Sequence, residues 1–262
     1  MAEFDLISGE AAFAATPLRS NIDAAKADRA AGTASARVAG SKEQIVLLFH
    51  GIGEAPRTVS VEERPYWIGK SFFLEIVDLL RTRSFEREVI LTFDDGNASD
   101  LFAASELARA GFQGYFFLLA GRLDWPCFID AAAAREISRA GMEVGLHGHA
   151  HVDWRSNSEP DWQREVVDAR AKIADAICAP VDSVAIPFGS YDRDVLKRLQ
   201  HYRFRRIFTS DPGPTPAGSR IFRRTTVKRD HSIRDLVDII ENRCGILQRT
   251  RRTIAPVIKS WR

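Results

Sequence analysis

Predicted strands and helices alternate along most of this sequence. Runs of mostly apolar residues predict buried strands at 45–49, 89–93, 115–119, 142–146 and 183–186, and shorter strands at 206–209 and 221–227. Apolar residues at helical spacing predict helices at 72–83, 99–110, 130–140, 159–177, 192–201 and 233–242. Such alternation is typical of a parallel sheet with crossover helices, either open or closed into a barrel.

Both ends of the chain depart from this pattern. Residues 1–43 are rich in Ala and poor in large apolar residues, which indicates a weakly structured arm or an extension packed on the surface. Residues 243–262 contain six basic residues and no acid, so that this tail could contact anionic lipid, or could simply be a solvated end. We therefore expect an extension (1–43), a barrel (44–242) and a basic tail (243–262).

Charge and cysteine content narrow the class of protein. Lys plus Arg number 37 and Asp plus Glu 35, a balance that argues against a nucleic-acid binder. The three cysteines are far apart, which argues against a disulfide framework and favours a reducing compartment. The first ten residues carry three acids and no base, unlike a secretory signal. We expect a cytoplasmic protein, with possible membrane association through its basic tail.

Polar residues gather where the predicted strands end, which is where ligands bind in such folds. One strand ends at His50, the next at Asp94 and Asp95, and a later one at His147 to His151. Two adjacent carboxylates need a cation to stay ionised, and a metal held by one would leave the other free as a base. The alternative for the doublet is a simple strand-end turn.

The histidines favour a metal site. The i, i+4 spacing of His147 and His151 lets both rings face one point, and two His with one carboxylate suit Zn²⁺ or a similar ion. The segment Pro187-Phe188-Gly189 is either a turn or a loop that offers a backbone N–H to a developing oxyanion.

Taken together, these residues resemble the polysaccharide deacetylase family, also called the NodB-homology domain or carbohydrate esterase family 4. Its motif TFDDG stands unbroken at Thr92 to Gly96, and its motif H-[ST]-x-x-H corresponds to His147 to His151, with Gly148 at the hydroxyl position. Its motif R-x-P-x-G corresponds to 185–189, with Ala185 in place of the Arg. The opening Phe49-His50-Gly51-Ile52 is also similar, and the resemblance covers about 45–241.

The resemblance implies a fold, an activity and a set of roles. The fold would be a distorted (β/α)7 TIM-like barrel, and the activity would be removal of acetyl groups from N-acetylated sugars in polysaccharide or glycolipid precursors. Asp94 would be the catalytic base, and Asp95, His147 and His151 would hold a divalent metal, most often Zn²⁺. The backbone N–H of Phe188 would help to stabilise the oxyanion.

Two departures from the family pattern generate further expectations. Ala185 leaves Asp94 without its usual cation, and we predict that Arg223 or Arg224 reaches it instead. The family's late Leu-x-His, which supplies a general acid, has no clear match. His231 is the nearest candidate, with a residue beside a helix cap as the alternative reading.

Other functions remain open at the level of sequence. The chain could be a metal-binding or sugar-binding homologue with impaired catalysis, an iron oxygenase with two His and one carboxylate, or a hydrolase of a non-sugar amide. Three tryptophans near strand ends could stack on sugar rings or could serve ordinary packing: Trp67, Trp125 and Trp154.

Overall fold

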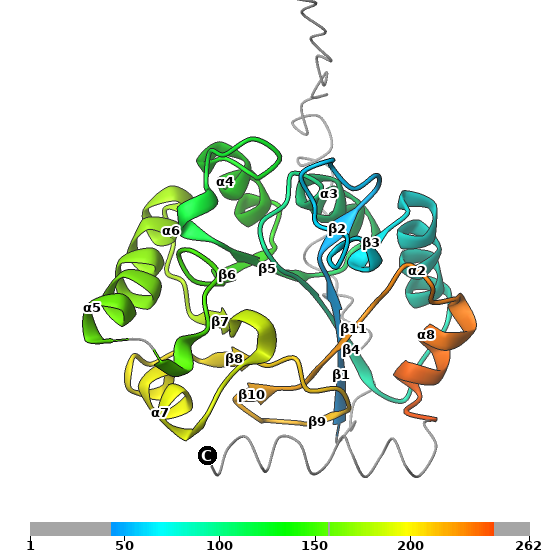
Figure 1. The fold of residues 1–262 in the computed structure, drawn as a ribbon. Coiled ribbons are helices and arrows are strands. Elements are labelled where there is room, and N and C mark those ends of the chain that lie inside the picture. The colour runs from blue at the N-terminus through cyan, green and yellow to red at the C-terminus, as the bar shows by residue number, and fades with distance from the viewer. Residues whose placement is uncertain (1–42, 157, 244–262) are drawn as a thin grey trace, which may run out of the picture. The chain divides into compact units, whose positions relative to one another are not determined.

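The fold is seen in a computed structural model that describes residues 43–156 and 158–243 (Figure 1). The predicted N-terminal extension and the basic tail therefore lie outside the described residues, apart from Glu43 and Arg243. No helix within the described ranges has both the length and the apolar character needed to cross a membrane.

Nine strands form one sheet: β1 (Glu43–Phe49), β4 (Glu88–Phe93), β5 (Gly114–Leu118), β6 (Glu143–Leu146), β7 (Ser183–Ala185), β8 (Arg206–Phe208), β9 (Thr215–Pro216), β10 (Ile221–Phe222) and β11 (Arg224–Thr226). Their order is β10-β8-β7-β6-β5-β4-β1-β11 and these pairings are parallel, whereas β9 pairs antiparallel with β1. A small second sheet joins β2 (Gly51–Ile52) to β3 (Trp67–Ile68).

The strand predicted at 221–227 is in fact two strands, and this division closes the barrel. β10 pairs with β8 and β11 pairs with β1, so the two pieces lie at opposite ends of the sheet order. Only Arg223 separates them in the chain, which brings the ends of the sheet together. With β10 and β11 taken as one bent strand, the ring has seven positions, and the predicted distorted (β/α)7 barrel is confirmed.

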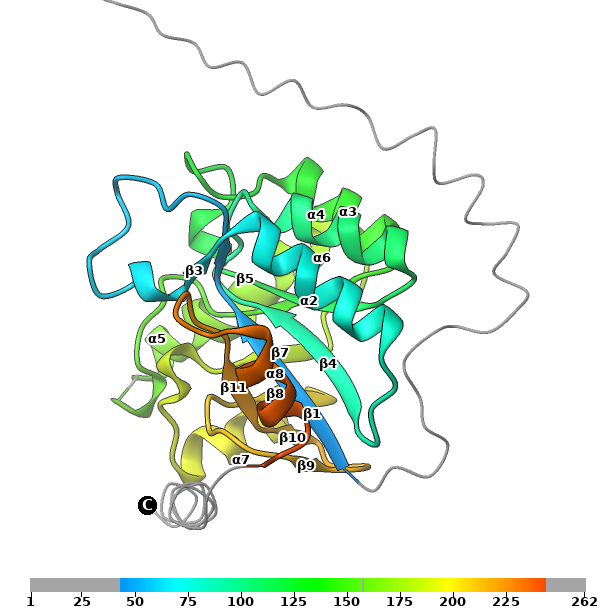
Figure 2. The ribbon, with the colours of Figure 1, turned by 90° about the vertical axis from the view of Figure 1, so that its right-hand side faces the viewer.

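Helices cover the outside of the barrel (Figures 1 and 2). They are α2 (Lys70–Thr82), α3 (Asp100–Ala110), α4 (Ala131–Arg139), α5 (Glu159–Trp162), α6 (Ala169–Ile177), α7 (Arg193–His201) and α8 (Ile233–Ile240). The helix predicted at 159–177 contains a π-helical segment at Gln163–Asp168. The side chains of Asp130, Asp192 and Ser232 cap α4, α7 and α8 by accepting backbone N–H groups.

The core has two layers. The larger layer lies between sheet and helices, where the rings of Phe49 and Phe116 stack on Phe93 at 5.2 and 4.5 Å. The smaller layer joins residues of β1, β5, β7, β8 and β10, and β1 and β5 do not pair with each other or with the other three, so this layer lies inside the ring: Val46, Phe117, Ala185, Phe208 and Phe222. Two rings of this inner layer, Phe117 and Phe208, lie against the side chain of Arg224 at the start of β11.

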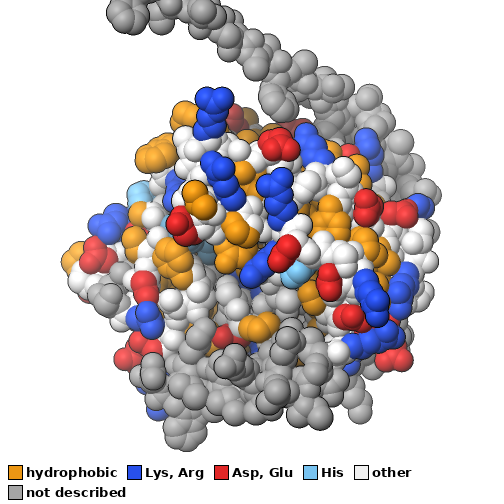
Figure 3. Space-filling model, turned by 45° about the vertical axis from the view of Figure 1, so that its right-hand side comes forward, with side chains coloured by type: hydrophobic (Ala, Val, Ile, Leu, Met, Phe, Trp, Pro, Cys, Tyr) orange, Lys and Arg blue, Asp and Glu red, His pale blue; other side chains and the backbone are white. Residues whose placement is uncertain are grey.

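On the face seen in Figure 3, basic and acidic side chains are interspersed, with hydrophobic side chains scattered among them. This face therefore carries no large patch of a single charge.

Candidate active site

The C-terminal ends of β4 and β6 bring the predicted metal ligands together. Asp95, His147 and His151 each offer one ligand atom, and these atoms all lie within 4.8 Å of one another. The Nε2 atoms of His147 and His151 are 3.7 and 3.8 Å from Asp95 Oδ1. Such a cluster, drawn from two strand ends, has the donor set and the spacing of a divalent-metal site.

The surroundings of these ligands fit a cation. Asp95 Oδ1 is buried without a hydrogen-bond partner. His147 Nδ1 lies 2.9 Å from the Ala185 carbonyl oxygen, a contact that places the proton on Nδ1 and leaves Nε2 free as a donor atom. Burial, followed by the nearby His147, lowers the pKa of His151 to about 4, so the His151 ring is neutral near pH 7.

Asp94 lies beside the ligands and pairs with a buried arginine. Arg224 Nη1 and Nη2 donate to its two carboxylate oxygens at 2.6 and 2.8 Å, and both side chains are almost fully buried. Burial alone would raise the pKa of Asp94, but Arg224 and His147 together hold it at about 2. The prediction that Arg223 or Arg224 reaches Asp94 is confirmed for Arg224, whereas Arg223 donates to the Pro212 carbonyl.

The barrel fixes Arg224 as well as Asp94. Arg224 Nε donates to the Thr209 carbonyl at 2.9 Å, and the guanidinium lies over the rings of Phe117 and Phe208 at 5.6 and 5.9 Å. The position where the family has its Arg is Ala185, whose methyl packs in the inner layer. A cation from β11 therefore occupies the place that the third motif usually fills from β7.

A buried acid that the sequence analysis missed braces the histidine loop. Glu165 Oε2 accepts the backbone N–H groups of His149 and Ala150 at 3.0 and 3.1 Å. Gly148 has a φ of 99°, and a Cβ there would lie 3.2 Å from Glu165 Oε2 and 3.2 Å from the Trp154 ring. Gly148, at the position where the second motif has a hydroxyl residue, thus leaves room for the Glu165 carboxylate and the Trp154 ring. The sequence signal that could have identified Glu165 is an acidic residue on the buried face of the predicted helix 159–177.

Phe188 lies against the metal ligands in a strained conformation. Its φ is 57°, in a region that bulky residues rarely adopt. Its ring centroid is 4.2 Å from that of His151, while 63% of the residue is exposed. The site therefore includes Phe188, and the role of its backbone N–H stays a prediction.

His50 lies beside the two carboxylates, whereas the described contacts of His231 lie in the turn before α8 and its role stays a prediction. Asp94 N donates to the Phe49 carbonyl at 3.0 Å, which ties the residue before His50 to Asp94. Burial lowers the pKa of His50, and the charges of Asp95 and Asp94 oppose this shift. His50 Nδ1 is buried without a partner. His231 instead accepts the Lys228 N–H in the turn before α8, as a helix-cap neighbour would. The strand-end position of His50 was the signal that could have identified it.

The tryptophans separate into two groups. Trp67 and Trp154 are 8% and 1% exposed, so the hypothesis that they stack on a sugar is wrong and they serve packing. Trp125 is 60% exposed, in the loop after β5.

Comparison with known proteins agrees with this geometry. The family model for polysaccharide deacetylases matches residues 82–207, a span that contains Asp94, Asp95, His147, His151 and Phe188. The resemblance inferred from the motifs is confirmed: residues 82–207 match the polysaccharide deacetylase family. No curated protein matches the sequence.

Solved structures of deacetylases share the fold. A polysaccharide deacetylase from Bacillus cereus has a TM-score of 0.66 and 16% identity, over 76% of this chain and 69% of its own. The deacetylase PplD of Streptococcus pyogenes, solved with acetate, has a TM-score of 0.63 and 17% identity, over 77% of this chain and 100% of its own. IcaB from Ammonifex degensii has a TM-score of 0.63 and 20% identity, over 76% and 97%.

Replacing Arg224 should expose the cost of an unpaired buried charge. We expect Arg224→Gln to lower the free energy of unfolding by about 3–5 kcal/mol, because Asp94 would stay buried without its cation. The measurement is urea unfolding of metal-free protein in EDTA. The control is Arg206→Gln, which breaks a partly exposed ion pair with Glu143 (3.2 Å) and should cost less than about 1 kcal/mol. Equal losses in the two variants would contradict this account of the pair.

Replacing Gly148 should weaken metal binding as well as folding. Gly148→Ala places a Cβ at positive φ, which costs about 1–2 kcal/mol, and also presses on Glu165, which shapes the ligand loop. Gly111→Ala is the control, because Gly111 also has a positive φ (76°) but has nothing within 4 Å of its Cβ position. We expect both variants to lose stability and only Gly148→Ala to lose zinc affinity, measured by competition with a chelator. Equal zinc affinities would exclude a role of this position in shaping the loop.

Proposed function

We propose that this protein is a divalent-metal-dependent hydrolase that removes the acetyl group from an N-acetylated sugar in a polysaccharide or glycolipid precursor. The observation that carries the proposal is the ionised Asp94, held by Arg224 beside a complete set of metal ligands. A site that only binds metal or sugar has no need of a second buried carboxylate, whereas hydrolysis needs a proton acceptor at this position. The match to the deacetylase family supports a sugar substrate.

Asp95, His147 and His151 would hold the metal. When bound there, a divalent cation such as Zn²⁺ supplies an electrophile for the amide carbonyl and lowers the pKa of water. The described residues offer two imidazole nitrogens and one carboxylate oxygen, which suit Zn²⁺ and several related ions.

Asp94 is the proton acceptor of this proposal. Arg224 orients both of its oxygens, and Oδ2 lies 3.6 Å from His147 Nε2, so the carboxylate is within reach of a water at the ligands. Its pKa of about 2 keeps it ionised at neutral pH. A carboxylate with so low a pKa gives up a proton readily, and in this proposal the proton that Asp94 takes from water reaches the leaving amine through His50.

Phe188 and His50 complete the mechanism. The strained backbone at Phe188 would direct its N–H toward the carbonyl oxygen as negative charge develops there. His50 would protonate the leaving amine, because it is the histidine at the site that is not one of the metal ligands and whose Nδ1 has no partner among the described residues. In this proposal His50 takes the role for which the sequence suggested His231.

The alternatives differ in what they require of the site. The argument for impaired catalysis depended on the absent third-motif Arg, and Arg224 now supplies that charge. An iron oxygenase would use the same three ligands but has no use for the Asp94–Arg224 pair.

A screen for acetate release distinguishes a sugar substrate from a non-sugar amide. It tests N-acetylated nucleotide sugars, lipid-linked sugars, chitooligosaccharides and acetylated peptides, with and without Zn²⁺. Release from peptides alone would overturn the sugar proposal.

The two adjacent carboxylates should respond differently to the same substitution. We expect Asp95→Asn to lose metal and activity together. Asp94→Asn should keep its metal, while its rate of acetate release falls by about 10²–10⁴, the usual contribution of a positioned proton acceptor. Metal content by mass spectrometry, paired with single-turnover kinetics, provides the test. An Asp94→Asn protein without metal, or with an unchanged rate, would refute this division of roles.

The two candidate proton donors can be compared directly. We expect His50→Gln to slow amide hydrolysis by about 10²–10⁴ and His231→Gln to have little effect. The loss in His50→Gln should be much smaller for an aryl acetate, because its leaving group departs without a proton. Steady-state rates on both substrates separate a proton donor from a residue needed only for folding. A larger loss in His231→Gln would restore the original assignment.

A further inference from the structure

Arg122 lies at the edge of the candidate site and has no role in the mechanism above. It is the last residue of the short 3₁₀ helix Ala120–Arg122, which follows β5. Because β5 lies between β4 and β6 in the sheet, this helix stands between the carboxylates and the histidine loop. Its position is fixed, since Ala120 N and Gly121 N donate to the carbonyls of Gly148 and His149, both at 2.9 Å.

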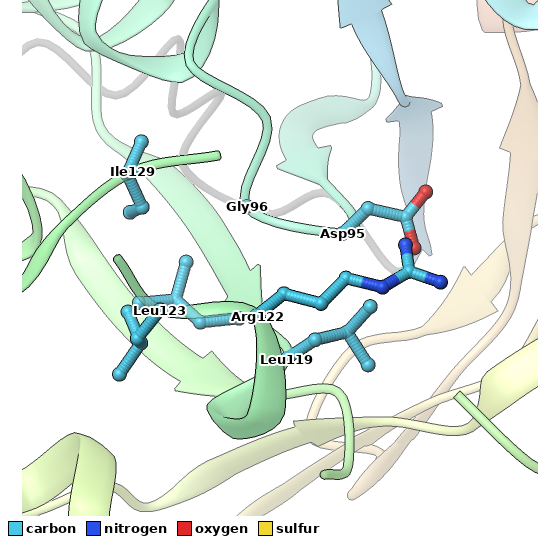
Figure 4. Close-up of a pocket in the computed structure, with 7 residues that line it drawn as sticks. Asp95, Gly96, Leu119, Arg122, Leu123 and Ile129 are labelled. Atoms are coloured by element: carbon cyan, nitrogen blue, oxygen red, sulfur yellow. The ribbon is translucent and has the colours of Figure 1, made fainter. Parts of the chain in front are cut away.

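The side chain of Arg122 extends from this helix toward Asp95 (Figure 4). Arg122 and Asp95 both line a small hollow that has no room for a ligand. Arg122 is half-buried, so its guanidinium can contact a substrate that approaches Asp95 from outside. The charge of Arg122 also contributes to the lowered pKa of His151, after burial and the nearby His147, which indicates that the guanidinium is close to the metal ligands.

Arg122 has no acidic side chain as a direct partner among the described residues. Among the residues that the structure describes, Arg122 forms no ion pair, and its guanidinium lies 5.0 Å from the Phe128 ring centroid. Asp94, Asp95, Arg224 and Arg122 together carry two negative and two positive charges. A divalent cation at the ligands would thus leave the site with net positive charge.

We infer that Arg122 binds an oxyanion, a phosphate or carboxylate group, that the substrate carries next to its N-acetylated sugar. The inference rests on the proposed function and adds a substrate class to it. A planar guanidinium that is free of carboxylates and supported by an aromatic ring is suited to bidentate binding of such groups. The exposed Trp125, three residues further along, offers a face on which the attached sugar could stack.

The first test measures binding without metal. Isothermal titration of EDTA-treated protein compares N-acetylglucosamine 1-phosphate, N-acetylmuramic acid and neutral N-acetylglucosamine. Hydrogen bonds to charged groups correspond to roughly tenfold to hundredfold in affinity, so we expect wild type to prefer at least one anionic sugar by about that factor. Arg122→Gln should lose the preference, and Arg122→Lys should keep part of it. The control Arg139→Gln, exposed on α4, should match wild type.

The second test uses the zinc-loaded enzyme. The ratio of kcat/KM for the anionic sugars to that for N-acetylglucosamine should fall in Arg122→Gln and stay constant in Arg139→Gln. A preference for the phosphate or for the carboxylate sugar identifies the source of the oxyanion. Equal ratios in wild type and Arg122→Gln, or no preference in wild type, would overturn the inference. Binding preference without acetate release from any sugar would instead refute the proposed function and leave the role of Arg122 supported.

Discussion

The ion pair between Asp94 and Arg224 is the constraint on which the site depends. Two charged side chains inside a barrel are tolerated only when each satisfies the other, because neither can reach water. Both oxygens of Asp94 and all three donor nitrogens of Arg224 are engaged, the last through the Thr209 carbonyl. The pair therefore fixes the ends of β4, β8 and β11 relative to one another, and with them the orientation of the adjacent Asp95.

The strand that closes the barrel also carries the arginine of this ion pair. Arg224 begins β11, directly after the bend at Arg223 that separates β11 from β10. If 221–227 were one straight strand, it could not pair with both β8 and β1, and the ring would stay open. The short strands and the break at Arg223 thus have a function, because they bring a cation across the barrel to the carboxylate on β4. This arrangement also explains how the chain tolerates Ala185, a position from which only a backbone carbonyl is now needed.

Local sequence patterns were sufficient for the long elements and for the metal ligands. Apolar runs such as 45–49 and caps such as Asp130 depend on neighbouring residues, so they could be predicted from the sequence. The ligands could be predicted because adjacent or i, i+4 residues necessarily share one location. Other features depend on contacts between distant segments and could not be derived in this way. The division of 221–227 and the hydrogen bonds from the histidine loop to Glu165 both depend on such contacts.

Backbone groups take part in the hydrogen bonds that position the histidine ligands. The Ala185 carbonyl orients the His147 ring, and the N–H groups of His149 and Ala150 donate to the buried Glu165. Nearly every residue type offers a backbone N–H and a backbone carbonyl. The side chain at such a position can therefore change without loss of the hydrogen bond. Arg122 differs, because the backbone fixes its helix but its guanidinium meets only the Phe128 ring among the described contacts. A cation on a fixed helix that forms no ion pair among the described residues is suited to bind an anionic group of the substrate.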